Sequence, residues 1–257
     1  MTKRFAAVFD VHRGYEIRHG HKYPIHDPKA WGAVLKFLDD FKPHHLIFGG
    51  DILDTGVISH HNHGRPRRVE GMRLIKDAEE CRQEVIHPAL ATLVSGGDAE
   101  FLVGNHEDWL EDLLDREPGL EGALDLRRLL GLSGVKMIPS GGVTHLGKLW
   151  FAHGDQIRGG EHAARAAVTY FNRSIRIGHY HTFQVFTATS AVDNELPNTG
   201  MVVPCLCTKD PAYNEGKPNR WAQGFLWGYI FDDGTYADQV AVIIRGRFWA
   251  NGKLYTD

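Results

Sequence analysis

The stretch Leu46-Ile47-Phe48-Gly49-Gly50-Asp51 decides the fold. Three apolar residues predict a short buried strand, and the two glycines let the backbone turn sharply and leave space beside it. A carboxylate follows at once, and open α/β sheets bind their ligands at the carboxyl ends of the strands. A Gly-Asp turn alone is equally typical of an ordinary loop, so its meaning depends on the rest of the chain.

Four further stretches place Asp, Asn or His at the end of an expected strand. They are Asp10-Val11-His12, Gly104-Asn105-His106-Glu107, His153-Gly154-Asp155 and Gly178-His179-Tyr180-His181. Side chains two apart in a strand point to the same side, which pairs Asp10 with His12 and His179 with His181. One such pair is typical of a polar strand end, whereas the combination predicts a metal site.

The polar residues at these strand ends are more numerous than one catalytic ion needs, and a carboxylate can bridge two ions. A mixture of carboxylate, amide and imidazole ligands is suited to Mn²⁺, Fe or Zn²⁺ and differs from a thiolate-type metal site. Ni²⁺ is a further candidate. Two ions roughly 4 Å apart are the usual machinery for hydrolysing phosphoesters. We therefore expect two divalent metal ions, with Mn²⁺ favoured. The expected ligands are Asp10, His12, Asp51, Asn105, His153, His179 and His181.

Length and composition predict an ordinary globular chain with one domain spanning residues 1–257. A formal net charge of -3 gives no global bias toward nucleic acid or anionic membranes, so any anion recognition must be local. No export signal is visible, and no apolar run approaches the roughly 20 residues of a membrane span. Three cysteines form no disulfide framework and fit a reducing compartment. We expect a cytoplasmic protein with no membrane partner and no obligate protein partner.

Hydrophobic periodicity predicts strands alternating with helices, followed by a run of strands. Helices are expected over 28–41, 69–86 (broken near Pro88), 110–114, 124–130 and 161–171. Strands are expected over 5–11, 46–48, 100–103, 148–152, 174–177, 182–191, 201–203 and 225–244, the last with a hairpin turn at Asp232-Asp233-Gly234. Residues 13–28 show no periodicity and are expected to form a loop. This order indicates an α/β fold with helices flanking two packed sheets.

The five ordered stretches resemble the motifs of the calcineurin-like metallophosphoesterases, in their compact single-domain microbial and phage form. The resemblance runs from Asp10 to His181, about two thirds of the chain. It implies a four-layer α/β/β/α sandwich with the metals at the strand ends. It also implies one ion held by Asp10, His12, Asp51 and His181, and a second held by Asp51, Asn105, His153 and His179, so that Asp51 bridges.

The same resemblance implies roles for two residues that are not ligands. His106 corresponds to the family histidine that contacts the phosphate and gives a proton to the leaving group, and Glu107 would orient His106. Two bound ions lower the pKa of a bridging water, which becomes the attacking hydroxide. The implied function is a dinuclear phosphoester hydrolase, with a phosphodiesterase acting on nucleic acid or nucleotide diesters favoured.

Two other functions stay open at this point. One is a phosphomonoesterase of the same family, and the other is a non-catalytic scaffold on the same fold. Family scaffolds lose ligands or the acid histidine, whereas all of these positions match in this chain. A mononuclear site for metal storage or sensing has no need of His106 and Glu107.

Several polar residues near these stretches have roles that the sequence leaves open. Clustered histidines either line the cleft or form solvated loops: His19, His21, His26, His60, His61 and His63. Arg65, Arg67 and Arg68 either begin a solvated helix or overhang the metal site. Arg158 is balanced between a phosphate clamp and a surface ion pair.

An aromatic run with a period of two lies near the end of the chain. Because this period is typical of a strand facing a core, we expect the run to be buried rather than to stack on bases. It consists of Trp221, Phe225, Trp227 and Tyr229.

Overall fold

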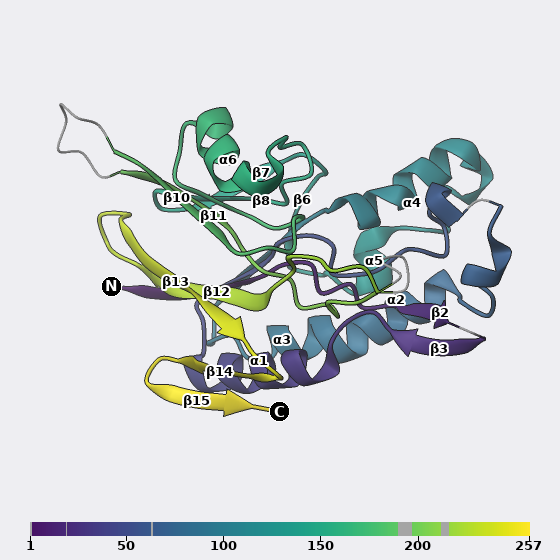
Figure 1. Cartoon of the computed structure of the whole chain (residues 1–257), viewed down its shortest axis with the longest axis horizontal. Helices are drawn as coiled ribbons and strands as arrows, with labels where there is room; N and C mark the ends of the chain where they lie inside the picture. Colours follow the sequence, from purple (N-terminus) through teal and green to yellow (C-terminus); the bar gives the residue numbers. More distant parts are fainter. Residues whose placement is uncertain (1, 19, 63, 190–196, 212–215) are drawn as a thin grey trace.

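The computed structural model describes residues 2–18, 20–62, 64–189, 197–211 and 216–257, and it shows a mixed α/β fold (Figure 1). A six-stranded sheet has the order β13-β12-β1-β4-β5-β6, and a five-stranded sheet has the order β10-β11-β9-β8-β7. The first contains β1 (Lys3–Val8), β4 (His45–Phe48), β5 (Asp98–Leu102), β6 (Lys136–Ile138), β12 (Gln223–Ile230) and β13 (Tyr236–Ile243). The second contains β7 (Val143–Leu146), β8 (Leu149–Ala152), β9 (Ile175–Ile177), β10 (Gln184–Ala188) and β11 (Asn198–Val202).

Three hydrophobic clusters hold the sheets and helices together. Phe37 of α1 (Pro28–Phe41) packs with Phe225 of the six-stranded sheet in a cluster that also includes α2 (Leu74–Cys81), α3 (His87–Leu90) and α5 (Leu126–Leu130). On the other face of that sheet, Phe5 and Ile47 pack against Phe151 of the five-stranded sheet. Helix α6 (Ala163–Phe171) covers the outer face of the five-stranded sheet, so α1 and α6 lie on opposite sides of the molecule (Figure 1).

Both sheets direct the carboxyl ends of parallel strands toward the same region. Strands β1, β4 and β5 pair in parallel, as do β8 and β9. The two sheets are also tied by a buried ion pair between Arg176 of β9 and Asp238 of β13, at 2.6 Å and 2.9 Å. Polar residues that follow these strands are therefore brought to one place by the sheets themselves.

The expected long helix has a different course in the structure. Helix α2 begins at Leu74, continues through a π-helical turn η3 (Arg82–Ile86), and runs on as α3 past Pro88, which does not break it. Proline lacks the N–H that would bond to the carbonyl four residues earlier. That carbonyl, of Glu84, instead accepts a hydrogen bond from the Trp31 indole N–H at 2.9 Å. The break predicted near Pro88 is wrong because a neighbouring helix supplies the missing donor.

Two hairpins occur where the sequence shows no strand signal. The expected loop over 13–28 contains β2 (Tyr15–Arg18) paired with β3 (His21–Pro24), and the C-terminal segment contains β14 (Arg247–Ala250) paired with β15 (Lys253–Thr256). All four residues of β3 are exposed, so an alternating apolar pattern is absent. By contrast, the predicted hairpin at Asp232-Asp233-Gly234 is confirmed by β12 and β13. Residues 190 and 191 of the expected strand 182–191 lie outside the described residues.

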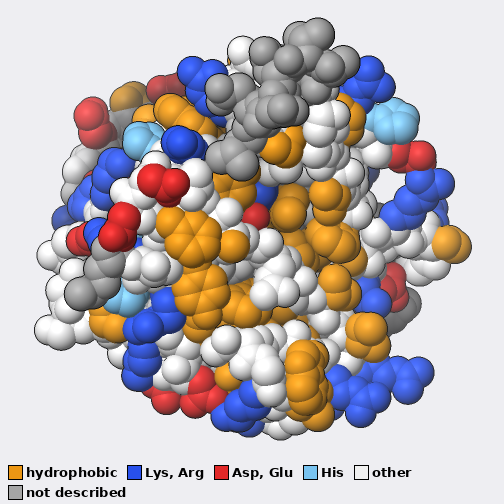
Figure 2. All heavy atoms as spheres, turned by 90° about the vertical axis from the view of Figure 1, so that its left-hand side faces the viewer, with side chains coloured by type: hydrophobic (Ala, Val, Ile, Leu, Met, Phe, Trp, Pro, Cys, Tyr) orange, Lys and Arg blue, Asp and Glu red, His pale blue; other side chains and the backbone are white. Residues whose placement is uncertain are grey.

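One end of the molecule, with the N-terminus and the β12–β13 turn, is shown in Figure 2. Hydrophobic side chains gather across the middle of this face, with Lys and Arg around them. Phe231 at the β12–β13 turn is 42% exposed. Within the described ranges, no helix is long and apolar enough to cross a bilayer.

Candidate metal centre

The polar residues predicted to be ligands meet where the strands end. Asp10 follows β1, Asp51 follows β4, and Asn105 is the first residue of α4 (Asn105–Arg116), which begins just after β5. From the second sheet, His153 directly follows β8 and His179 and His181 follow β9. Parallel strands thus bring residues up to 171 positions apart in the chain into one site.

The backbone around the site adopts conformations that are uncommon for residues other than glycine. Among the described residues, Asp10, His12, Asp51, His179 and His181 all have φ between 50° and 66°. Non-glycine residues in this left-handed region cluster at functional sites, where each costs on the order of 1–3 kcal/mol. The sequence predicts that Asp10 and His12, and likewise His179 and His181, point the same way because they alternate along a strand. In the structure, tight turns rather than strand residues direct both side chains of each pair into the site.

Glycines make room for this packing. Gly50 has φ of 95°, and a Cβ there would lie 2.5 Å from His153 Nδ1. A Cβ on Gly104 would lie 2.3 Å from Asp51 Oδ1. The Gly49-Gly50-Asp51 stretch predicts space beside the backbone, and the side chain of the candidate ligand His153 occupies that space at Gly50.

Four of the expected ligands surround one point on one side of Asp51. His12 Nε2 lies 3.2 Å from His181 Nε2, and His181 Nε2 lies 3.3 Å from Asp10 Oδ1. His12 Nε2 is also 3.8 Å from Asp51 Oδ2 and 4.0 Å from Asp10 Oδ1. Two imidazole nitrogens facing each other at this distance need a proton or a cation between them, which fits the donor set of a metal ion.

A second group lies on the other side of Asp51. His153 Nε2 is 3.3 Å from Asp51 Oδ2 and 3.1 Å from Asn105 Oδ1, which in turn is 3.0 Å from His179 Nδ1. His153 Nδ1 is 3.0 Å from the carbonyl oxygen of Gly49 and can donate a hydrogen bond to it. This bond fixes the ring and directs the lone pair of Nε2 toward the site, where it could bind a metal ion. Groups of residues able to hold a metal ion are present on both sides of Asp51, which belongs to one group with His12 and His106 and to another with His153 and His179.

The electrostatics of the site favour bound cations. Burial raises the pKa of Asp51, but His153, His106 and His12 outweigh it and hold that pKa well below its usual range. Burial lowers the pKa of His153, but Asp51 and Asp10 more than compensate and raise it to about 10. Without a metal ion, a proton on His153 thus offsets the negative charge of the neighbouring carboxylates. A divalent ion would compete with that proton.

His106 lies at the edge of the ligand sets and faces a carboxylate that the sequence analysis missed. His106 Nδ1 is 3.2 Å from Asp54 Oδ2, an ion-pair distance without hydrogen-bond geometry, and His12 Nδ1 is 3.2 Å from the same oxygen. Burial lowers the pKa of His106, but Asp51 and Asp54 outweigh it and raise the pKa to about 9. Asp54 follows Asp51 by three residues, and this spacing was the available signal.

The carboxylate of Glu107 contacts the Asp51 loop. Its carboxylate accepts hydrogen bonds from the backbone N–H groups of Asp51, Ile52, Leu53 and Gly104, at 2.6–2.9 Å. These contacts shape the Asp51 loop, and the orientation of His106 by Glu107 stays a prediction. A fully buried carboxylate on the first turn of α4 can satisfy four donors that the tight turn leaves free.

Cys207 is a second residue that the sequence analysis missed. Its Sγ lies 3.7 Å from His181 Nδ1, on the far side of the ring from Asp10, and both residues are buried. Burial raises the pKa of the Cys207 thiol well above its usual range, so the group stays neutral. Because Cys205-Leu206-Cys207 has the wrong spacing for a zinc knuckle, the pattern gave no reason to place Cys207 here.

Arg13 anchors the loop that carries His12. Its side chain is fully buried and donates to Glu84 Oε2 and Glu80 Oε2, each at 2.9 Å, and to the Tyr15 hydroxyl at 3.0 Å. Burial lowers the pKa of Arg13, but hydrogen bonds and charges from Glu84 and Tyr15 raise it above its usual value. The π-helical turn that contains Glu84 thus contacts the residue next to a candidate ligand.

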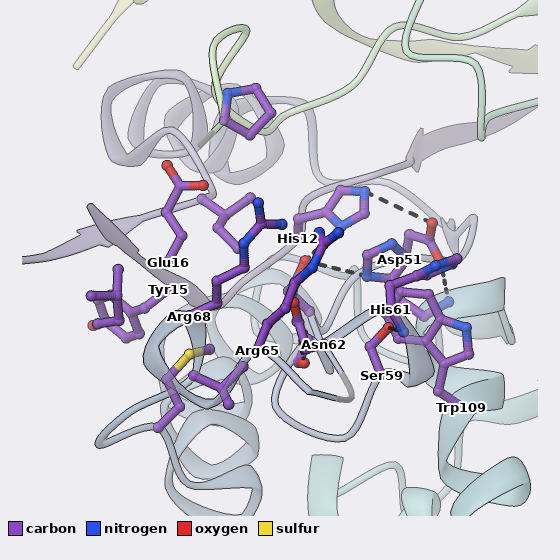
Figure 3. Close-up of a pocket in the computed structure, with 18 of the residues that line it drawn as sticks. His12, Tyr15, Glu16, Asp51, Ser59, His61, Asn62, Arg65, Arg68 and Trp109 are labelled. Carbon is purple, nitrogen blue, oxygen red and sulfur yellow. Dashed lines mark hydrogen bonds and ion pairs between the residues drawn. The ribbon is translucent and has the colours of Figure 1, made fainter. Parts of the chain in front are cut away.

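A cavity of about 1060 Å³ opens over the site, lined by candidate ligands on one side and by residues of 56–62 and 64–72 on another (Figure 3). His61, Arg65 and Arg68 line it, whereas Arg67 and Arg158 do not. The segment runs through two short turns, η1 (His60–Asn62) and η2 (Pro66–Arg68). His63 and His19 lie outside the described residues, His21 is exposed, and His26 is buried away from the cavity lining.

Two tryptophans border the ligands. The Trp109 ring lies 4.1 Å from the His106 ring, and the Trp221 ring lies 4.2 Å from the His181 ring, measured between centroids. Both line the cavity and are partly exposed. Phe225 and Trp227 are buried in the core as expected, but the prediction of burial is wrong for Trp221, which precedes β12 and turns toward the site.

Comparisons with known proteins give full-length relatives but no family. No family model matches the chain. The Gene 54 protein of Mycobacterium phage L5 is 24% identical over 272 residues, and that of Mycobacterium phage D29 is 25% identical over 276 residues. Each alignment covers 99% of this chain and 99% of the relative. The crystal structure of Pseudomonas putida nuclease MPE matches with a TM-score of 0.39 and 15% identity, covering 87% of this chain and 83% of that one. A similarity this low bears on neither fold nor activity.

Proposed function

We propose that the protein is a dinuclear metal-dependent phosphoester hydrolase of the calcineurin-like metallophosphoesterase superfamily. One observation carries this proposal: Asp51 Oδ2 lies between two sets of donors, 3.3 Å from His153 Nε2 and 3.8 Å from His12 Nε2. A carboxylate oxygen in this position suits a bridge between two divalent ions. The first set is Asp10, His12, Asp51 and His181, and the second is Asp51, Asn105, His153 and His179.

The proposed family also accounts for the layers of the fold. Helices pack on the outer faces of two sheets that pack on each other, and we interpret this as the four-layer α/β/β/α sandwich of a single domain spanning residues 1–257. The ligands come from the carboxyl ends of both sheets, so the site depends on their packing. Cytoplasmic localisation and the absence of an obligate protein partner stay predictions from the sequence.

Two divalent ions, with Mn²⁺ favoured, would supply Lewis-acid polarisation of the phosphoryl oxygens and a water of lowered pKa. The protein's own side chains supply the remaining chemistry. His106 donates its proton to the departing oxygen, and the Asp54 carboxylate beside Nδ1 keeps the imidazole protonated until then. Glu107 holds the backbone of the Asp51 loop, so that the bridging carboxylate does not shift when the substrate binds.

A phosphodiester is the favoured substrate because of the size and lining of the cavity. A volume of about 1060 Å³ lies slightly above the roughly 300–1,000 Å³ typical of small-molecule sites, and a lone phosphate group needs little of it. Cations line the cavity beyond the ligands, at Arg65 and Arg68. A phosphomonoesterase is the alternative. A scaffold role has less support, since five of the seven donors and His106 line the cavity, and the other two, Asp10 and His153, contact His181 and Asp51 behind them.

The test measures hydrolysis of bis(4-nitrophenyl) phosphate and 4-nitrophenyl phosphate by purified protein before chelation, after chelation and after Mn²⁺ is restored. We expect chelation to abolish turnover, Mn²⁺ to restore it, and the diester to be the better substrate. Asp51→Asn measured in parallel should stay inactive after Mn²⁺ is added. Equal activity with and without metal would contradict the proposal, and preference for the monoester would favour the alternative.

A further inference from the structure

We propose that the cavity binds a single strand of nucleic acid, with Arg65 and Arg68 contacting its phosphates and Trp109 and Trp221 stacking on its bases. This inference rests on the proposed function for what happens to the strand, but not for how it binds. It places the scissile phosphate over Asp51 and the flanking nucleotides toward the two tryptophans.

The first support is the position of the arginines. Arg65 and Arg68 both line the cavity, and Figure 3 shows both side chains extending into the space beside His12. Neither has an ion pair or side-chain hydrogen bond with any described residue, whereas Arg18, which also lines the cavity, pairs with Glu16. Two cations that line a cavity and have no carboxylate partner in the described part of the chain are suited to contact an anion. Arg67 belongs to the same turn but does not line the cavity.

The second support is a continuous row of rings along the cavity. From Trp109 the row passes through His106, His12 and His181 to Trp221, with centroid separations of 4.1, 4.4, 5.1 and 4.2 Å. The metal ligands His12 and His181 lie in its middle, and a tryptophan lies at each end. A strand laid along this row would place a base near each tryptophan when a phosphate lies over the ligands.

The third support concerns which form of nucleic acid fits. Aromatic side chains stack on base faces, which are available in unpaired strands and covered in a duplex. The protein has a formal net charge of -3, so attraction to a polyanion must come from local cations. The carboxylates that line the cavity have partners: Glu16 pairs with Arg18, Asp54 with His12, and Asp51 with His153. Among the described residues, Arg65 and Arg68 are therefore the cavity-lining cations for which no carboxylate partner is present.

The test is equilibrium binding of a fluorescein-labelled thymidine oligonucleotide with phosphorothioate linkages, which keep their charge and resist hydrolysis. Anisotropy is measured with Mn²⁺ at salt concentrations from roughly 50 to 200 mM. The double variant Arg65→Ala with Arg68→Ala should bind more weakly and reduce the salt slope by about 1.4, the value for two contacts on a single strand. Arg67→Ala is the matched control and should leave the slope unchanged.

The stacking contribution is tested with Trp109→Ala and Trp109→Phe, and with Trp249→Ala as an exposed control on β14. Trp109→Ala should weaken binding about tenfold, within the range for one stacked base, and Trp109→Phe should largely preserve binding. Thermal unfolding of each variant checks that the fold is intact.

Three outcomes would overturn the inference: equal slopes for the double variant and Arg67→Ala, tighter binding of a duplex than of the single strand, or no loss for Trp109→Ala. Turnover of bis(4-nitrophenyl) phosphate by the wild type separates this inference from the proposed function. Binding of the strand without turnover of the diester would contradict the proposed hydrolase function and support the binding site. Turnover of the diester, together with unchanged strand binding in all variants, would support the hydrolase function and contradict the binding site.

Discussion

The seven candidate ligands form the floor of the site, and residues 56–62 and 64–72 form its rim. Floor and rim differ in how their side chains are held. Floor side chains such as Asp10 and Asp51 are buried and follow directly from strands of the packed sheets. Rim side chains such as Arg65 and Arg68 are exposed and rest on two short turns. Floor charges face one another within 3–4 Å, whereas the rim arginines face open space.

This difference indicates a division of labour. Charges that must be held at fixed separations for chemistry are placed on the most rigid part of the molecule, with uncommon backbone angles maintained by packing. The charges proposed to contact a longer substrate, Arg65 and Arg68, are exposed and lie on or next to a short turn. Substitutions in the floor should therefore affect metal binding and turnover, and substitutions in the rim should affect substrate affinity.

The largest effect is expected at Asp51. Asp51→Asn removes the one carboxylate that both proposed ligand sets share, so both metal content and turnover should fall to background. His181→Ala, which removes a ligand from one set, should retain part of the metal. Elemental analysis and diester hydrolysis of both variants check this. If the two variants lose metal equally, Asp51 has no bridging role.

The next effect separates chemistry from metal binding within the floor. His106→Ala should lose roughly 10²–10⁴ in rate, the usual contribution of general acid catalysis, while retaining the metal. The loss should be smaller for a nitrophenolate leaving group, which needs no proton. His106 also lies near His12 and Asp51 in a group able to hold an ion, so loss of metal in this variant would identify it as a ligand.

A smaller effect is expected from the layer behind the ligands. Cys207→Ala removes the contact to His181 Nδ1 and should lower metal affinity about tenfold, as losing an outer partner of a ligating histidine does. Cys81→Ala is the control, because that buried thiol contacts the carbonyl of Ile52 rather than a ligand. Metal titration followed by competition with a chelator measures both. Equal affinities in the two variants would remove Cys207 from the account.

The smallest effect is expected in the rim itself. Asn62 donates a side-chain hydrogen bond to the Gly56 carbonyl at 2.8 Å, and Asn62→Ala should lower the free energy of unfolding by about 1 kcal/mol. Urea unfolding measures this, and amide exchange at Gly56 should become faster while exchange in β4 stays slow. A loss of metal in this variant would show that rim and floor are not separable.

That the floor residues meet in one place could be predicted from the sequence because they follow apolar strands. Asp10, Asp51 and His153 each follow a hydrophobic run, and parallel strands fix where such residues meet. The mixed α/β class follows from the same pattern. Asp54, Cys207 and Trp221 were missed because their positions depend on how turns pack around the ligands. The hydrophobic periodicity of the sequence does not indicate how these turns pack.

The rim and the hairpins could not be predicted for a related reason. Strand β3 is exposed throughout, so no burial pattern marks it. The continuation of the long helix past Pro88 depends on Trp31, a residue 57 positions away, and Arg65 and Arg68 differ from Arg67 only in the direction set by a short turn. Local sequence carries little information about contacts of this kind.

The central claim is that Asp51 bridges two ions held by the floor. Crystals grown with Mn²⁺ and measured near the manganese absorption edge test it most directly, because anomalous peaks locate each ion. The account predicts two peaks roughly 4 Å apart on either side of Asp51 Oδ2, one against His12 and His181 and the other against His153 and His179. No peak, or a single peak away from Asp51, would contradict it.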